Sequence, residues 1–251
     1  MLRSKLIDDL IASVKTNNAG VKDVRVGISW TGVYGNYCGL SKTYGIPVKH
    51  KNYTRNMGNL TQMTTLELAE YSQSWNLVEA SIGVAAIMAM IPPQANTPEF
   101  NAEELILEKG NGKKVVMVGA FPFIDKLRVA AKEFYILELD PSFLDPNNNI
   151  IPATASEYLI PESELLVVTG SALINKSLER ILALARENNT YTVILGPSTI
   201  MSEVFFDYGA DVLAGSEVLK PEAILQKISQ SGGMVDSKSC PGEITFRVMM
   251  R

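Results

Sequence analysis

Residues 115–140 read VVMVGAFPFIDKLRVAAKEFYILELD, and this stretch decides the fold that we expect. A short β-branched run ends at Gly119, an apolar helical stripe through Leu127 follows, and a second apolar run ends at Glu138 and Asp140. This order predicts parallel strands, because parallel strands need a crossover to return to the same edge. Ligands collect at the carboxyl ends of such strands, where Gly119, Glu138 and Asp140 lie.

The later part of the chain repeats this pattern. Apolar runs at 165–168, 192–195 and 211–214 each end in small or hydroxyl residues. Such residues let a ligand approach the backbone, although short turns also favour them for helix capping. These turns contain Thr169, Gly170 and Ser171, then Gly196, Pro197 and Ser198, and finally Gly215 and Ser216.

The chain before residue 98 has a different pattern, which predicts a separate α+β domain. A helical stripe covers 2–14, an alternating strand covers 24–28, and a later helix over 76–91 carries Glu79 as its only charge. A helix that is apolar all round is expected to be buried. Residues 92–100 (PPQANTPEF) are the best candidate for a linker. We therefore expect domains over 1–98 and 99–251.

Composition argues against two classes of partner. The net charge is −4 and the sequence pI is about 5.2, so neither nucleic acid nor an anionic membrane surface is an expected partner. No apolar run approaches the roughly 20 residues of a membrane span, and the first 15 residues lack a secretory signal. Two distant cysteines fit free thiols in a reducing cytoplasm. The apolar helix could be covered by its own chain or by a second subunit, which leaves a homo-oligomer open.

The candidate residues for catalysis and ligand binding are acids, one lysine and aromatic side chains. One histidine, His50, and two cysteines in no metal-ligand spacing argue against a preformed zinc or copper site. No Ser/His/Asp arrangement is visible. Acid–base work would fall to Glu138, Asp140, Asp125, Glu217 or Lys42, while Tyr34, Tyr37 and Phe121 could stack on a planar ring.

The turn Gly119-Ala120-Phe121-Pro122 stands where a dinucleotide fingerprint would, but GxGxxG is absent. Pro122 has no backbone N–H to donate, and the Phe121 ring fills the space beside the turn. We therefore do not expect this turn to cradle a pyrophosphate. Glu138 follows Gly119 by 19 positions, near the offset of about 20 at which an acidic residue binds ribose hydroxyls. The same spacing also arises in any short βαβ unit. An S-adenosylmethionine-like or heteroaromatic ligand fits this loop better than NAD. The cofactor stays unknown.

Several segments together resemble the family of putative heavy-metal chelation proteins. The segments are SIGVAA at 81–86, VGAFP at 118–122, Glu138, TGS at 169–171 and LGPS at 195–198. Met88 stands where the family often has asparagine. The resemblance implies a domain similar to the enolase amino-terminal fold, then a Rossmann-like domain partly similar to methyltransferases, with a site between them.

We expect this interdomain crevice to bind a pterin-, flavin- or siderophore-like chelator or its precursor, with condensation or hydrolysis as the reaction to test. Alternatives are a non-catalytic carrier of a metal chelate, an S-adenosylmethionine-dependent methyltransferase, and a structural or regulatory protein with an empty crevice. Glu138 and Lys42 are the catalytic candidates. The ligand-binding candidates are Asn36, Cys38, Gly119, Ala120, Phe121, Pro122, Asp140, Thr169, Gly170, Ser171, Gly196, Pro197 and Ser198.

Overall fold

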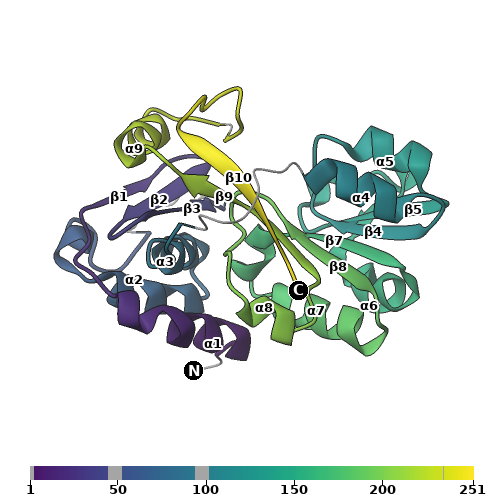
Figure 1. Ribbon diagram of the computed structural model, residues 1–251, viewed down its shortest axis with the longest axis horizontal. Helices are drawn as coiled ribbons and strands as arrows, with labels where there is room; N and C mark the ends of the chain where they lie inside the picture. The colour runs from purple at the N-terminus through teal and green to yellow at the C-terminus, as the bar shows by residue number, and fades with distance from the viewer. Residues whose placement is uncertain (1–2, 45–52, 94–101, 234) are drawn as a thin grey trace.

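A computed structural model describes residues 3–44, 53–93, 102–233 and 235–251 (Figure 1). It contains two sheets. The first is antiparallel and consists of β1 (Asp23–Val26), β2 (Trp30–Tyr34) and β3 (Cys38–Lys42). The second has seven strands and is mostly parallel. The predicted fold class, a small α+β part followed by a mostly parallel α/β part, is confirmed.

The large sheet reverses its strand order in the middle. The order is β10-β9-β8-β7-β4-β5-β6, so β4 and β7 flank the switch point, and only β10 runs antiparallel. Ligands of doubly wound sheets bind outside the strand ends at such a point. The strands are β4 (Lys114–Val118), β5 (Glu133–Glu138), β6 (Ile150–Pro152), β7 (Leu165–Thr169), β8 (Tyr191–Leu195), β9 (Val212–Val218) and β10 (Ile244–Met250).

One expected strand end is wrong. Gly215 and Ser216 do not form a turn but lie inside β9, opposite Arg247 and Phe246 of β10. The sequence pattern broke at glycine and serine, whereas the ladder continues because β10 pairs along the whole of β9. Glu217 therefore lies on a strand.

The period of two along β4 distributes the core over both faces of the large sheet. Val115 and Met117 pack in the cluster that holds residues of α4 (Ala102–Gly110) and α5 (Ile124–Ala130). Val116 and Val118 belong to the cluster on the other face, which contains α7 (Leu178–Glu187) and much of the first part of the chain. The remaining helices of this part are α6 (Ser156–Leu159), α8 (Val204–Asp207) and α9 (Pro221–Ser229).

The first part of the chain is built around a buried helix. Its helices are α1 (Lys5–Val14), α2 (Thr65–Ala69) and α3 (Leu77–Met88). Every residue from Val78 to Met88 is buried, as the apolar pattern predicted. Thr64 and Glu67 form a capping box on α2, and the Asn76 side chain caps α3.

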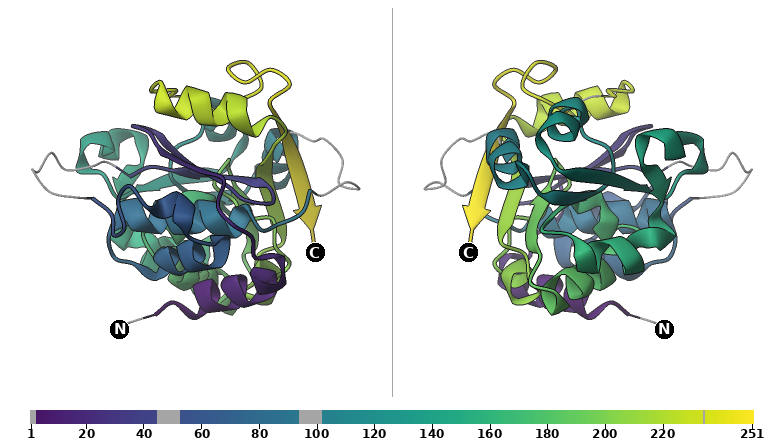
Figure 2. Two further views of the ribbon diagram at one scale, coloured as in Figure 1. Left: turned by 90° about the vertical axis from the view of Figure 1, so that its left-hand side faces the viewer. Right: turned by 90° about the vertical axis from the view of Figure 1, so that its right-hand side faces the viewer.

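The small sheet lies between α3 and α9 (Figure 2). Val33 and Gly39 face α3, whereas Gly32 and Leu40 face the apolar residues of α9. Because α9 follows β9, the second part of the chain supplies one wall of the first sheet. The boundary at residue 98 stays a prediction, since residues 94–101 lie outside the described residues.

Candidate functional site

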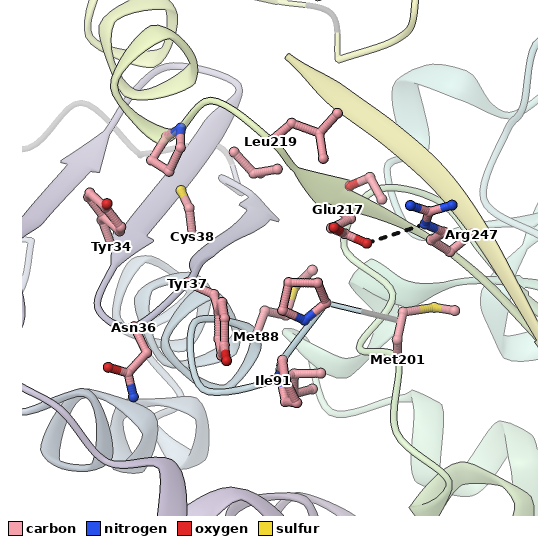
Figure 3. Close-up of a pocket in the computed structure, with 15 residues that line it drawn as sticks. Tyr34, Asn36, Tyr37, Cys38, Met88, Ile91, Met201, Glu217, Leu219 and Arg247 are labelled. Carbon is pink, nitrogen blue, oxygen red and sulfur yellow. Dashed lines mark hydrogen bonds and ion pairs between the residues drawn. The ribbon is translucent and has the colours of Figure 1, made fainter. Parts of the chain in front are cut away.

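A pocket opens between the small sheet and strands β9 and β10 (Figure 3). With its open mouth, which includes space open to solvent, it encloses about 730 Å³. Both parts of the chain line it. The first contributes Tyr34, Asn36, Tyr37, Cys38, Met88 and Ile91, and the second contributes Met201, Ser216, Glu217, Leu219 and Arg247.

The turn between β2 and β3 holds the aromatic side of this pocket. The Tyr37 N–H donates to the Ala89 carbonyl at 3.1 Å, and its own carbonyl accepts from the Gly35 N–H at 2.9 Å. The Asn36 amide donates to the Asn17 carbonyl at 3.0 Å. These bonds tie the turn to the end of α3 and to the segment after α1, so the turn is positioned before any ligand arrives.

Glu217 and Arg247 form a charged pair on the opposite wall. Arg247 Nε lies 3.3 Å from Glu217 Oε2, and each side chain is only about 20% exposed (Figure 3). The two residues lie on adjacent antiparallel strands, whose register brings them together. The pair offers a hydrogen-bond acceptor and a donor at one point of the wall.

Cys38 lines the pocket as a neutral thiol. Burial raises the pKa of Cys38 to about 12, with Glu222 and Asp23 adding to the effect. Metals bind thiolates, so this cysteine is a poor metal ligand near neutral pH. Within the described part of the chain, no three His, Cys, Asp or Glu side chains are placed to hold a metal ion. His50 lies outside the described residues.

A second group of predicted residues meets at the switch point of the large sheet. Gly119, at φ +84°, adopts a left-handed conformation, and a Cβ there would lie 3.0 Å from Thr169 Cγ2. A Cβ on Gly196 would lie 3.6 Å from the Phe121 ring, which stacks on Phe123. Ala120 and Pro122, in the same turn, are exposed.

The two acids after β5 differ in environment. Burial raises the pKa of the half-buried Glu138, opposed by N–H groups of Leu139 and Ala120. Hydrogen bonds from Ser142 lower the pKa of Asp140, whose side chain caps the short turn that follows. Asp140 thus has a structural role there, whereas Glu138 has the more perturbed environment.

Tyr44 connects the first part of the chain to the end of β7. Its hydroxyl donates to the Ser171 carbonyl at 3.4 Å and accepts from the Asn175 amide at 3.1 Å. Thr169 Oγ1 and Ser171 Oγ lie 2.8 Å apart and share a hydrogen bond. Thr169 Oγ1 also accepts from the Ser171 N–H. The hydroxyls of this turn are therefore engaged with one another.

The turn after β8 also holds the two parts together. Ser198 is buried, and its Oγ accepts from the Lys42 N–H at 2.8 Å. Ser216 Oγ donates to the Pro197 carbonyl at 3.2 Å. Lys42 Nζ lies 5.6 Å from the centre of the Trp30 ring.

The predicted residues thus fall into two groups. Asn36 and Cys38 line the pocket, whereas Gly119, Phe121, Thr169 and Gly196 lie at the switch point. Glu138 and Lys42 do not line the pocket. Gly170 packs against the Thr199 backbone, where a Cβ would approach to 2.6 Å.

Sequence reasoning missed Arg247. The signal was a cation inside the apolar strand ITFRVMM, but its significance depends on Glu217, which is 30 positions earlier in the chain.

Comparison with known proteins identifies the family. Residues 101–240 match a family described as "Putative heavy-metal chelation", and residues 7–91 match a second one with the same description. The first match covers more than half of the chain. The chain belongs to this family. The resemblance seen in the sequence is thereby confirmed.

Relatives of the family share the fold along nearly the whole chain. A protein with unknown function from Desulfitobacterium hafniense superposes with a TM-score of 0.83 at 23% identity, covering 98% of both chains. One from Pyrococcus horikoshii gives 0.79 at 22% identity and covers 100% of both. An uncharacterized protein of Methanocaldococcus jannaschii is 28% identical over an alignment of 189 residues that covers 72% of this chain and 71% of that protein.

The helices that the structure describes include none that is both long and apolar enough to cross a membrane.

Proposed function

We propose that the pocket between the small sheet and strands β9 and β10 binds a small polar heteroaromatic metabolite in heavy-metal chelation. The ligand would be a pterin-, flavin- or siderophore-like chelator or a precursor of one. The Glu217–Arg247 pair, facing Tyr34 and Tyr37 across the pocket, carries the proposal. A carboxylate accepts from ring N–H groups, a guanidinium donates to oxygens, and aromatic side chains pack on a flat ligand.

The chemistry of the lining favours an organic chelator over a bare ion. The raised pKa of Cys38 keeps its thiol protonated, and Glu217 already has Arg247 as a partner. Met88, Ile91 and Met201 add an apolar surface that suits a ring system. The donor atoms for a metal would then come from the bound molecule.

Binding alone accounts for the arrangement, and a reaction is a further step of the same proposal. Because Glu138 and Lys42 do not line the pocket, acid–base work on a ligand there would fall to Glu217. The engagement of Glu217 in an ion pair favours the alternative of a carrier that binds a metal chelate without turnover.

The first experiment is native mass spectrometry of the purified protein, with release and identification of any bound molecule. Calorimetric titration then uses 6-carboxypterin, riboflavin and 2,3-dihydroxybenzoate, the last with and without ferric ion. We expect saturable binding of at least one probe. Arg247→Met should weaken it at least tenfold, or by about 1.4 kcal/mol, because a charge-assisted donor is lost.

Arg25→Met is the matched control, since Arg25 pairs with Asp23 on β1 and does not line the pocket. It should leave the affinity unchanged. A protein that purifies without a ligand and binds none of the probes would contradict the proposal. Binding of ferric ion alone would replace the chelator with a direct metal site.

A further inference from the structure

A second cavity lies where the start of α1 meets the start of α7, and it shares no lining residue with the pocket. We call it the N-terminal groove, lined by Arg3, Ser4, Gln73, Trp75, Lys176 and Glu179. With its open mouth it encloses about 450 Å³. Both parts of the chain contribute, and Figure 1 shows that α1 begins beside α8.

Three of these residues form a fixed frame. Gln73 accepts from the Ser4 N–H and donates to the Ser4 carbonyl, each at 2.9 Å. Ser4 Oγ caps α1 through the Ile7 N–H at 3.2 Å. Arg3 forms ion pairs with Asp8 and Glu70. A ligand would therefore meet a preorganised wall.

Lys176 brings a cation to this wall that has no counter-charge among the described residues. It is half-buried, its Nζ donates to the Ile174 carbonyl at 2.8 Å, and no described carboxylate lies within ion-pair distance. Its backbone has φ +70°, a conformation that lysine rarely adopts. Burial of an unpaired cation and backbone strain are both unfavourable, and strained residues concentrate at functional sites. Burial lowers the pKa of Lys176 to about 8, so the amine is still mostly charged at pH 7.

Glu179 brings the opposite charge to the same groove. Its Oε2 accepts from Ser4 Oγ at 2.6 Å, and no described cation forms an ion pair with it. Lys176 is only three positions earlier, yet the two charges do not pair with each other. Trp75 adds a large apolar ring that is 61% exposed. The groove thus presents a separated cation and anion beside an aromatic face.

We infer that the N-terminal groove binds a small zwitterion with a flat apolar side chain, such as an aromatic α-amino acid. Its carboxylate would pair with Lys176, its ammonium group would pair with Glu179, and its side chain would pack on Trp75. Both charges, which have no ion-pair partner within the described ranges, then gain one. This site is independent of the ligand of the pocket.

The test uses Trp75 as a reporter. The chain has two tryptophans, so Trp30→Phe leaves the indole of Trp75 as the only one. Its fluorescence is followed on titration with L-phenylalanine, N-acetyl-L-phenylalanine and L-phenylalaninamide, and calorimetry repeats the titrations on the unmodified protein. We expect L-phenylalanine to bind with a Kd below about 1 mM, and each blocked compound to bind at least tenfold more weakly.

Two substitutions assign the charges. Glu179→Gln should abolish the discrimination against the N-acetyl compound, and Lys176→Met should abolish the discrimination against the amide. Lys15→Met, on an exposed lysine outside the groove, is the control and should change neither. No saturable signal up to about 10 mM, equal binding of the three compounds, or unaltered discrimination in both variants would overturn the inference.

Discussion

At the scale of one residue, Lys176 combines an unfavourable backbone conformation with the burial of a charged amine. A non-glycine residue in the left-handed region costs about 1–2 kcal/mol, and Lys176 adopts φ +70° just before α7. Desolvation is the cause of its lowered pKa, and no acid among the residues that the structure describes pairs with the amine. The charged form is therefore disfavoured in the folded protein, and this preference makes stability depend on pH.

The sign of that dependence leads to a prediction for Lys176→Met. The pKa of Lys176 is about 8 in the folded protein, against an ordinary value of 10.5 for a lysine in water. Below pH 8 both states are protonated and the burial cost is fully present, whereas between pH 8 and 10.5 the folded state loses its proton first and the cost is relieved. Lys176→Met should therefore raise the free energy of unfolding by about 1 kcal/mol at pH 7, because partial exposure screens the charge, and by less at pH 10.

Urea unfolding at both pH values measures this difference. Methionine keeps a Cβ at the strained position, so the backbone cost is the same in both proteins. Lys15→Met should show no such change with pH, and a stabilisation by Lys176→Met that does not shrink by pH 10 would contradict the argument.

At the scale of elements, α3 packs against its neighbours backbone to backbone. A Cβ on Gly39 of β3 would lie 1.9 Å from the Ala85 carbonyl oxygen of α3. A Cβ on Gly83 of α3 would lie 1.9 Å from the Ser72 nitrogen, in the turn before α3. Both obstacles are backbone atoms, which cannot move aside as the end of a side chain can. Glycine at both positions lets a helix with no polar face be covered on all sides.

Gly39→Ala should accordingly destabilise the protein by about 3 kcal/mol, at the upper end of the cost of overpacking a core. The matched control is Gly20→Ala, because a Cβ there meets nothing within 4 Å and should change stability by no more than about 0.5 kcal/mol. Urea midpoints at constant m-value give both numbers. Equal stability of the two variants would show that α3 can shift away from β3.

At the scale of the whole molecule, the two parts of the chain share one core. The largest apolar cluster joins Leu6 and Ile82 of the first part to Val116, Leu166 and Leu182 of the second. The helix α9 covers the face of the small sheet that α3 leaves open, and Tyr44 and Ser198 add hydrogen bonds across the boundary. The first part of the chain therefore depends on the second for much of its burial.

A fragment of residues 1–93 should consequently fail to fold alone, because the faces that pack on α7, α8 and α9 would be exposed to water. Circular dichroism and urea titration of the fragment, beside the intact protein, provide the measurement. A sigmoidal unfolding transition of the fragment would show that the first part is an autonomous domain.

The candidate site was only partly readable from the chain. Local spacing was enough to identify Gly119, Thr169 and Gly196 as strand-end residues, and these meet at the switch point. The predicted ligand-binding residues also include Asn36 and Cys38, which line the pocket. Local spacing cannot show that these two groups are distinct, because the separation depends on how the small sheet is docked.

The sequence by itself determined the fold class and several of the elements. Periods of two and 3.6 in apolar residues placed parallel strands and the buried helix, because these signals depend on neighbours within one turn or one pleat. Only the tertiary structure decided that Gly215 and Ser216 stay within β9, that Arg247 meets Glu217, and that α9 crosses to cover the first sheet. Each of these features depends on contacts between residues that are distant in the chain. A local sequence pattern does not predict the free energy of such contacts.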